Sequence, residues 1–262
     1  MSALTDHSRI RVVKFGGAIA DDPVARAEAL RAVAALPEPC IVVHGGGSMA
    51  SELSVRLGIE PRMHDGRRIT DADTLRVVTM VYAGLINTTF VAELQALGCR
   101  AVGMRGCDDD IIRAHRRSPE PIDFGYVGDI DYVRNDRLVA LLRDGVVPVI
   151  APITHDGHGQ LLNTNADTVA ARIALAFASQ CLVEVVYCFA HDGVLRNVSQ
   201  PDSVIDAMSV AELDAFVASG AAAGGMLAKL ENARALAVQG VDVRICSYHD
   251  FTGGTRIYGE RA

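Results

Sequence analysis

The sequence predicts an α/β fold in which helices cover both faces of a mostly parallel sheet, a three-layer αβα sandwich. Short β-branched runs alternate with longer amphipathic or alanine-rich runs, and most connections between them are short. The 262 residues suffice for a full core, and half of them are hydrophobic. No repeat or low-complexity tract interrupts the alternation, so we expect a single domain over 1–262.

The first half of the chain contains strand-like and helical segments in alternation. Pro37 ends the first helical pattern, and Gly84 could break the second. In chain order we expect strand 9–15, helix 24–37, strand 40–45, helix 71–97, strand 99–104 and a β-hairpin or ribbon over 124–135.

The second half continues the alternation with clearer end signals. Asn135 and Gly145 are typical helix-start and helix-end residues, and Ser209 with Glu212 forms a capping-box pattern. We expect helix 135–145, strand 146–153, hairpin 155–163, helix 165–179, strand 181–189, helices 208–220 and 225–240, and strands 241–247 and 254–259.

Composition disfavours several classes of protein. The net charge of −7 is wrong for a nucleic-acid-binding surface. The N-terminal residues lack an apolar signal segment, and no uninterrupted apolar run reaches the ~18 residues of a membrane span. Six cysteines without a Cys-x-x-Cys pair indicate reduced, partly buried thiols rather than a zinc site. We therefore expect a cytoplasmic protein.

Two glycine-rich turns follow the first two strands. Gly16 and Gly17 follow the first, and Gly45, Gly46 and Gly47 follow the second, before a helix near Ser48. Ligands bind beyond the carboxyl ends of parallel strands, and glycine lets backbone N–H groups approach an anion. These turns therefore favour an anion site, although glycine can also simply make a tight turn. Neither is a Walker loop or a Gly-x-Gly-x-x-Gly motif.

Lysine is scarce in this chain. Of the 25 basic residues two are Lys and the other 23 are Arg, and both lysines, Lys14 and Lys229, lie next to glycine-rich stretches. A lysine ammonium is a compact point charge, whereas arginine is a wide planar fork. Phosphoryl transfer needs positioning and charge neutralisation more than covalent chemistry. We therefore expect both ammonium groups to face one polyanionic pocket.

Five motifs occur in the order found in the amino-acid kinase superfamily: "VVKFGG", "VVHGGG", "GRRITD", "LLNTNAD" and "GGMLAK". The resemblance runs from about Arg11 to Ile257 and is strongest to the N-acetylglutamate kinases. The middle stretches, such as "GCDDDIIRAHRR" and "VYCF", resemble the subgroup of Bacteroidetes-type organisms. The resemblance implies the amino-acid kinase fold, with lobes of about 1–165 for the acyl amino acid and 166–262 for the nucleotide. It implies MgATP, so ATP and Mg²⁺, and transfer to the γ-carboxylate of an N-acylated glutamate without a covalent enzyme intermediate.

The resemblance also implies roles for particular residues. Lys14 and Lys229 would be catalytic, the first at the transferring phosphoryl group and the second on the ATP side, with Asp167 orienting both. Arg68 would pair with the substrate α-carboxylate and Asn163 would bind near its amide. Backbone N–H groups would come from the phosphate-binding Gly16, Gly17 and Gly45 and the substrate-binding Gly46 and Gly47. No metal-ligating side chain is implied.

Simpler interpretations stay open for some of these residues. Asp167 could be a first-turn helix residue, Asn163 a turn residue, and Arg67 rather than Arg68 could face the substrate. A γ-carboxylate has a reference pKa of about 4.3 and is already ionised, so no general base is needed. His115 and His191 are therefore expected in loops or at the surface.

The sequence departs from the family pattern at Ala18 and around Asp192, where relatives carry other residues. The acyl group also stays open, because a succinyl group would need a further cation from among Arg67, Arg105 and Arg113. Carbamate kinase and uridylate kinase are disfavoured by "GRRITD", and a non-catalytic nucleotide or amino-acid sensor by the two lysines and Asp167.

The resemblance further implies the oligomeric state. Relatives that arginine inhibits carry an extra N-terminal helix, and only about ten residues precede the first strand here. We expect an arginine-insensitive homodimer that binds small molecules. The helix 71–97 is either its contact surface or a core helix.

Overall fold

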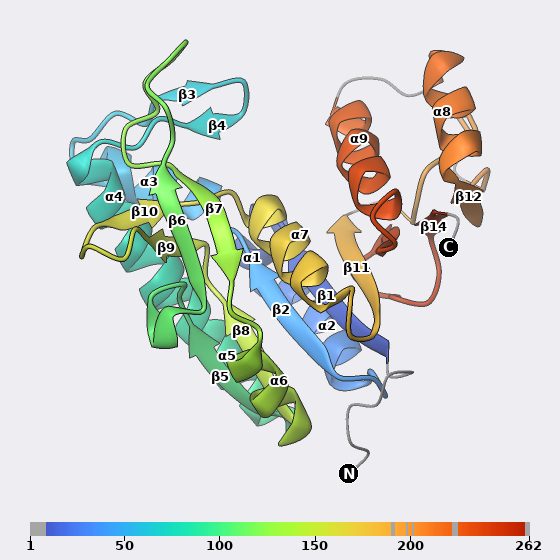
Figure 1. The fold of residues 1–262 in the computed structure, drawn as a ribbon, viewed down its shortest axis with the longest axis horizontal. Coiled ribbons are helices and arrows are strands. Elements are labelled where there is room, and N and C mark those ends of the chain that lie inside the picture. Colours follow the sequence, from blue (N-terminus) through green and yellow to red (C-terminus); the bar gives the residue numbers. More distant parts are fainter. Residues whose placement is uncertain (1–8, 190–191, 198, 201, 222–224, 260–262) are drawn as a thin grey trace.

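Eight strands form the central sheet of the computed structural model, which describes residues 9–189, 192–197, 199–200, 202–221 and 225–259 (Figure 1). The strand order is β12-β14-β13-β11-β1-β2-β8-β5, and every neighbouring pair is parallel except β13 with β14. The strands are β1 Arg9–Phe15, β2 Cys40–His44, β5 Arg100–Met104, β8 Val146–Ile150, β11 Leu182–Phe189, β12 Ala207–Ser209, β13 Asp242–Ser247 and β14 Thr255–Tyr258.

Helices cover both faces of this sheet, as the alternating sequence predicts. Successive strand residues point to opposite faces, so Val12 joins one buried cluster and Val13 the other. On the face of Val13 lie α1 Gly17–Asp21, α2 Pro23–Ala34, α3 Gly47–Arg56, α4 Ala72–Val78 and α5 Asn87–Ala96. On the face of Val12 lie α6 Asp136–Arg143, α7 Ala166–Phe177, α8 Val210–Ala218 and α9 Gly225–Ala237. The three-layer prediction is confirmed.

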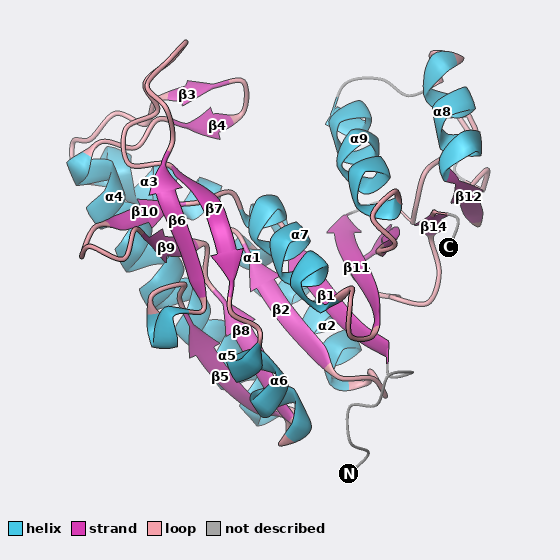
Figure 2. Cartoon of the chain, in the orientation of Figure 1, coloured by secondary structure: helices cyan, strands magenta, loops and turns pink. Residues whose placement is uncertain are grey.

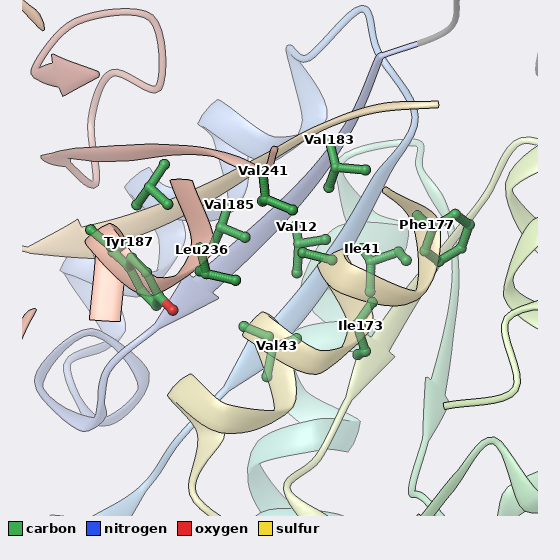
Figure 3. Packing of buried hydrophobic residues seen from close by; sticks show 14 of the residues in the cluster. Val12, Ile41, Val43, Ile173, Phe177, Val183, Val185, Tyr187, Leu236 and Val241 are labelled. Atoms are coloured by element: carbon green, nitrogen blue, oxygen red, sulfur yellow. The ribbon is translucent and has the colours of Figure 1, made fainter. Parts of the chain in front are cut away.

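The cluster on the face of Val12 joins the two ends of the chain. Figure 3 shows side chains of β1 and β2 packed against Ile173 and Phe177 of α7, with Leu236 of α9 beside β11. Phe177 is 1% exposed and Ile173 is fully buried. Burying each such side chain stabilises the fold by roughly 1.5–3 kcal/mol. This packing fixes α7 and α9 against β1 and β11.

A second sheet of four strands and a short hairpin lie beyond the central sheet (Figure 2). The sheet has the order β10-β9-β6-β7, with β6 Ile112–Arg116, β7 Gly128–Val133, β9 Ile153–His155 and β10 Leu161–Asn163. The hairpin pairs β3 Met63–His64 with β4 Arg67–Arg68. The hairpin expected over 155–163 is confirmed, whereas the predicted strand 146–153 divides into β8 and the start of β9.

The hairpin predicted over 124–135 is wrong. Residues 128–133 form the single strand β7, and its antiparallel partner is β6, which precedes it in the chain. An alternating pattern of apolar and polar residues indicates that one face of a strand is buried, but it does not identify the strand that pairs with it. The partner was missed because "IRAHR" contains three basic or imidazole side chains and reads as polar.

The long helical stretch is continuous rather than broken at Gly84. Its middle part, Thr79–Ile86, is a π-helical segment between α4 and α5. By length and composition alone, the span Ala72–Ala96 is long and apolar enough to cross a membrane. Polar residues interrupt it, so it does not contain an uninterrupted apolar run of about 18 residues. Val78, Phe90 and Leu94 of this span are fully buried in the core cluster on the face of Val13.

Local end signals were mostly correct. Ser209 and Glu212 form the expected capping box at α8. Asn135 precedes α6, but its side chain donates to the carbonyl oxygen of Ala176 at 2.6 Å instead of capping the helix. The cysteines are free as expected, although Cys107 is exposed rather than partly buried.

Candidate active site

A cavity of about 330 Å³ lies at the carboxyl ends of β1 and β2, where α3 and α7 begin. The family resemblance gives roles in the site to ten residues. Nine of them line this cavity: Lys14, Gly16, Gly17, Gly45, Gly46, Gly47, Arg68, Asn163 and Asp167. The tenth, Lys229 of α9, does not line it but lies close enough to interact electrostatically with Lys14 and Asp167. Two helix N-termini that open on one cavity favour a negatively charged ligand.

The two glycine turns touch each other at the cavity wall. The Gly45 N–H donates to the carbonyl oxygen of Phe15 at 2.9 Å. A side chain on Gly17 would approach the backbone nitrogen of Gly47 to 3.3 Å, and one on Gly46 would overlap Ile86 of the π-helical segment. Close packing therefore disfavours a side chain at Gly46, because Ile86 and Tyr82 would have to shift, whatever ligand the turn binds.

Lys14 and Asp167 form an ion pair across the cavity. Lys14 Nζ lies 2.8 Å from Asp167 Oδ1, and the lysine side chain is only 12% exposed. Asp167 is in the first turn of α7, where Asn165 Oδ1 accepts hydrogen bonds from the backbone N–H groups of Asp167 and Thr168. Asn165 thus fixes the start of α7. It was missed, although an Asn two residues before Asp167 is itself a helix-start signal.

Lys229 approaches this ion pair from another element. Its ammonium lies over the ring of Phe189, 3.8 Å from the centroid. Burial lowers the pKa of Lys229, and so does the positive charge of Lys14, while Asp167 opposes the shift. The two lysines, 215 positions apart in sequence (229 − 14), are therefore within electrostatic range of each other and of one carboxylate.

Arg68, not Arg67, is the buried member of the arginine pair. Arg68 is 8% exposed, and its Nη2 donates to the carbonyl oxygen of Gly47 at 2.8 Å and to Ser51 Oγ at 2.7 Å. Its Nη1 is buried with no hydrogen-bond partner among the described residues. Arg67 is exposed at the cavity rim. A guanidinium with one nitrogen anchored and one unpaired is suited to bind a carboxylate.

Two further residues bound the cavity near Arg68. Asn163 is 9% exposed, and its Nδ2 donates to Thr70 Oγ1 at 3.0 Å, so it is held rather than free in a turn. Tyr82, from the π-helical segment, also lines the cavity. Burial raises the pKa of the Tyr82 phenol, and the neighbouring Arg68 guanidinium opposes that shift. No local sequence pattern indicated a role for Tyr82, because its position depends on the packing of the long helix.

A buried histidine precedes the second glycine turn. His44 is fully buried, and burial lowers its pKa to about 4, so the ring is neutral. Nδ1 lies 3.0 Å from the carbonyl oxygen of Gly45, and Nε2 lies 3.0 Å from Asn87 Nδ2. Since Asn87 donates, Nε2 accepts and Nδ1 carries the proton that Gly45 accepts. The ring thus fixes the Gly45 carbonyl at the second glycine turn.

The other arginines considered as substrate contacts divide into two sets. Arg105 and Arg113 pair with Asp108 and Asp110 at 2.9 and 2.5 Å and do not line the cavity. Arg117, which the sequence did not single out, lines it and binds Asp129 through two nitrogens.

The remaining expectations concern residues outside the cavity. His115 is exposed and pairs with Asp131 at 2.6 Å, as expected for a surface histidine. Ala18 and Asp192 are exposed and do not line the cavity. His191 lies outside the described residues.

The cavity does not contain a protein-built metal cage. Within the described ranges, no group of three or more His, Cys, Asp or Glu side chains could hold a metal ion. Mg²⁺ commonly binds through one or two carboxylates plus substrate phosphates. The half-exposed Asp167 fits that mode, in which most oxygen ligands arrive with the nucleotide.

The fold and the cavity define an anion-binding α/β protein with paired lysines at the carboxyl edge of a parallel sheet. The chain belongs to the amino acid kinase family, whose model matches residues 9–247. A protein of Phocaeicola vulgatus named acetylglutamate kinase is 48% identical over 224 residues, which cover 86% of this chain and 87% of that protein. One of Bacteroides fragilis with the same name is 44% identical over 252 residues, which cover 95% and 97%.

A solved structure shows the same fold at low identity. The crystal structure of smu.665 from Streptococcus mutans superimposes with a TM-score of 0.78 at 22% identity, and the match covers 95% of this chain and 98% of that one. The expected amino-acid kinase fold is thus confirmed, as is the resemblance to Bacteroidetes members of the family.

The packing of the second glycine turn gives a first prediction. Gly46→Ala should destabilise the protein by about 1–3 kcal/mol, because the added methyl overlaps Ile86. Gly47→Ala is the matched control, since its nearest neighbour would be Arg68 Nη2 at 4.0 Å. Thermal unfolding monitored by circular dichroism measures both. Equal melting temperatures for the two variants would contradict the packing argument.

Proposed function

We propose that this protein is an ATP-dependent N-acetyl-L-glutamate 5-kinase that acts in arginine biosynthesis. The observation that carries the proposal is the Lys14–Asp167 ion pair at 2.8 Å in a glycine-lined cavity, with the Lys229 ammonium close by. The relatives named acetylglutamate kinase cover most of the chain at 44–48% identity, which supports the same substrate.

The reaction needs charge neutralisation rather than a base. A γ-carboxylate oxygen of the acylated glutamate attacks the γ-phosphorus of ATP, a new P–O bond forms, and the bond to the bridging oxygen of ADP breaks. The carboxylate is ionised at neutral pH, so no proton is removed. Negative charge spreads over the transferring phosphoryl oxygens. Preorganised cations and N–H groups stabilise such a transition state.

The residues at the cavity have different roles in this reaction. Lys14 contacts the transferring phosphoryl group, and Lys229 neutralises charge on the ATP side. Asp167 orients Lys14 through the observed ion pair. Its negative charge also offsets part of the repulsion between the two ammonium groups. The backbone N–H groups of Gly16, Gly17 and Gly45 approach the phosphates.

The acylated glutamate occupies the other part of the cavity. The unpaired Nη1 of Arg68 pairs with its α-carboxylate, and Asn163 contacts its amide. Gly46 and Gly47 offer N–H groups to the attacking carboxylate. We propose that about 1–165 bind the acyl amino acid and about 166–262 the nucleotide, with the glycine turns and Lys14 of the first part reaching the phosphates where the two sites meet.

Mg²⁺ is part of this proposal as a companion of ATP. When bound, it would neutralise negative charge on the phosphates. Asp167 is the one carboxylate of the described cavity lining near enough to share it.

N-succinyl-L-glutamate is a second candidate substrate. Arg67 and Arg117 line both this cavity and an adjoining one of about 480 Å³. A succinyl group carries one more carboxylate than an acetyl group, and these two guanidinium groups at the cavity wall would attract it, Arg117 in competition with Asp129. Arg105 and Arg113 do not contribute.

We also propose a cytoplasmic homodimer. Met80 and Leu85 on the helical span Ala72–Ala96 are 52% and 58% exposed, while the opposite side of the span is buried in the core. One helix thus offers both a core face and an apolar outer face, which is suited to pair with a second copy.

A panel assay tests the substrate. Release of ADP from ATP should depend on an acylglutamate, and N-acetylglutamate and N-succinylglutamate compared by kcat/KM identify the acyl group. Carbamate precursors and UMP serve as negative controls. ATP binding without turnover on any substrate would instead indicate a sensor, and turnover on UMP or on bicarbonate with ammonia would contradict the proposal.

Lys14→Arg tests the point-charge requirement. We expect kcat to fall by roughly 100-fold or more, because a planar guanidinium cannot take the position of the ammonium between Asp167 and the phosphoryl group. Unchanged circular dichroism and melting temperature verify that the variant folds. Turnover like that of the unsubstituted protein would show that the compact charge is not required.

Double substitution of the exposed face tests the dimer. Met80→Ser with Leu85→Ser should convert a dimer to a monomer in sedimentation equilibrium, whereas Val24→Ser, at an exposed site on α2, should not. A protein that sediments as a monomer before any substitution would contradict this part of the proposal.

A further inference from the structure

The Lys229 ammonium is held at the site by an aromatic ring rather than by an acid. Lys229 Nζ lies 3.8 Å from the centroid of the Phe189 ring, well within the range at which a ring face attracts a cation. Lys229 has no ion-pair partner within 4.0 Å in the described part of the chain. The ring is therefore its direct partner.

The strand register places Phe189 next to the reacting groups. Lys14 of β1 pairs in register with Tyr187 of β11, and Phe189 lies two residues further on the same face of the same strand. Asp167 at the start of α7 contacts Lys14, and α9 brings Lys229 over the ring. Side chains from β1, β11, α7 and α9 thus meet at this edge of the sheet.

The charges at this point explain why a neutral partner matters. Lys14 and Lys229 contribute two positive charges and Asp167 one negative charge, so the cluster retains a net charge of +1. A carboxylate under Lys229 would bring that sum to zero and would compete with the phosphates for the ammonium. A ring face attracts the ammonium through its quadrupole and leaves the charge and the outward N–H donors available.

We propose that Phe189 is a positioning residue for Lys229. The Phe189 ring holds the Lys229 ammonium beside the Lys14–Asp167 pair without neutralising its positive charge, so the ammonium stays available to bind a polyphosphate. This inference rests on the proposed function for its ligand, ATP. Without the ring, Lys229 would still be repelled by Lys14 and partly desolvated, and it would spend less time at the site.

The test varies the ring's electrostatics at nearly constant size. Phe189 is replaced by mono-, di- and trifluorinated phenylalanine through nonsense suppression, because each fluorine weakens the negative potential of the ring face. The same residues at Phe177, which is fully packed at the other end of α7, control for general effects of fluorination. The dissociation constant of the ATP analogue AMP-PNP is measured by calorimetry, and kcat/KM for ATP by ADP release.

We expect stepwise weakening across the Phe189 series and none at Phe177. Phe189→Leu should lower kcat/KM for ATP about 3- to 30-fold, the range of a partly desolvated cation–π contact. A flat Phe189 series in a protein that binds AMP-PNP would overturn the inference. A protein that binds no AMP-PNP at all would instead overturn the proposed function.

A second readout does not depend on activity. Because the chain has only two lysines, [¹³C,¹⁵N]lysine labelling gives two side-chain signals, and Lys229→Arg assigns them. The ring stabilises the charged form, so Phe189→Leu should lower the pKa of Lys229 further below its ordinary value. Phe189→Glu should raise that pKa and still weaken AMP-PNP binding. An unchanged pKa in Phe189→Leu, or tighter AMP-PNP binding in Phe189→Glu, would show that the ring does not act as proposed.

Discussion

The repulsion between two ammonium groups is the constraint on which this site depends. Lys14 and Lys229 come from the first strand and the last long helix; Asp167 pairs with Lys14, and the ring of Phe189 contacts the Lys229 ammonium. Asp167 contacts Lys14 directly and also attracts Lys229 through space, whereas the neutral ring contacts Lys229. The cluster therefore keeps a net positive charge for an anionic ligand inside an acidic protein.

The parallel sheet supplies the geometry for that cluster. Because β1, β2 and β11 run in the same direction, their carboxyl ends meet at one edge, and α1 and α3, which follow β1 and β2, begin there. Buried contacts then hold the second glycine turn in place: His44 binds the Gly45 carbonyl, and Ile86 fills the space beside Gly46. The π-helical segment contributes both Ile86 and Tyr82, so the shape of the long helix decides the shape of the cavity wall.

Sequence reasoning was weakest for pairing between distant strands. The alternation of residues 128–133 indicated a strand, but its partner β6 lies across an intervening loop, and no local pattern encodes that choice. For the same reason Arg117 was not singled out, since it reaches the cavity only through the second sheet and its bond to Asp129. Arg105 and Arg113 looked equally suitable in sequence, yet nearby carboxylates pair with both.

The sequence by itself determined the alternating architecture, both glycine turns and the identity of the two scarce lysines, because periodicity, turn chemistry and composition are local properties. Only the tertiary structure decided that Arg68 faces inward and Arg67 outward, that His44 supports the second glycine turn, and that Phe189 lies under Lys229. Those facts depend on which elements pack together and in which register, and packing between residues that are distant in sequence leaves no mark within a short window of sequence.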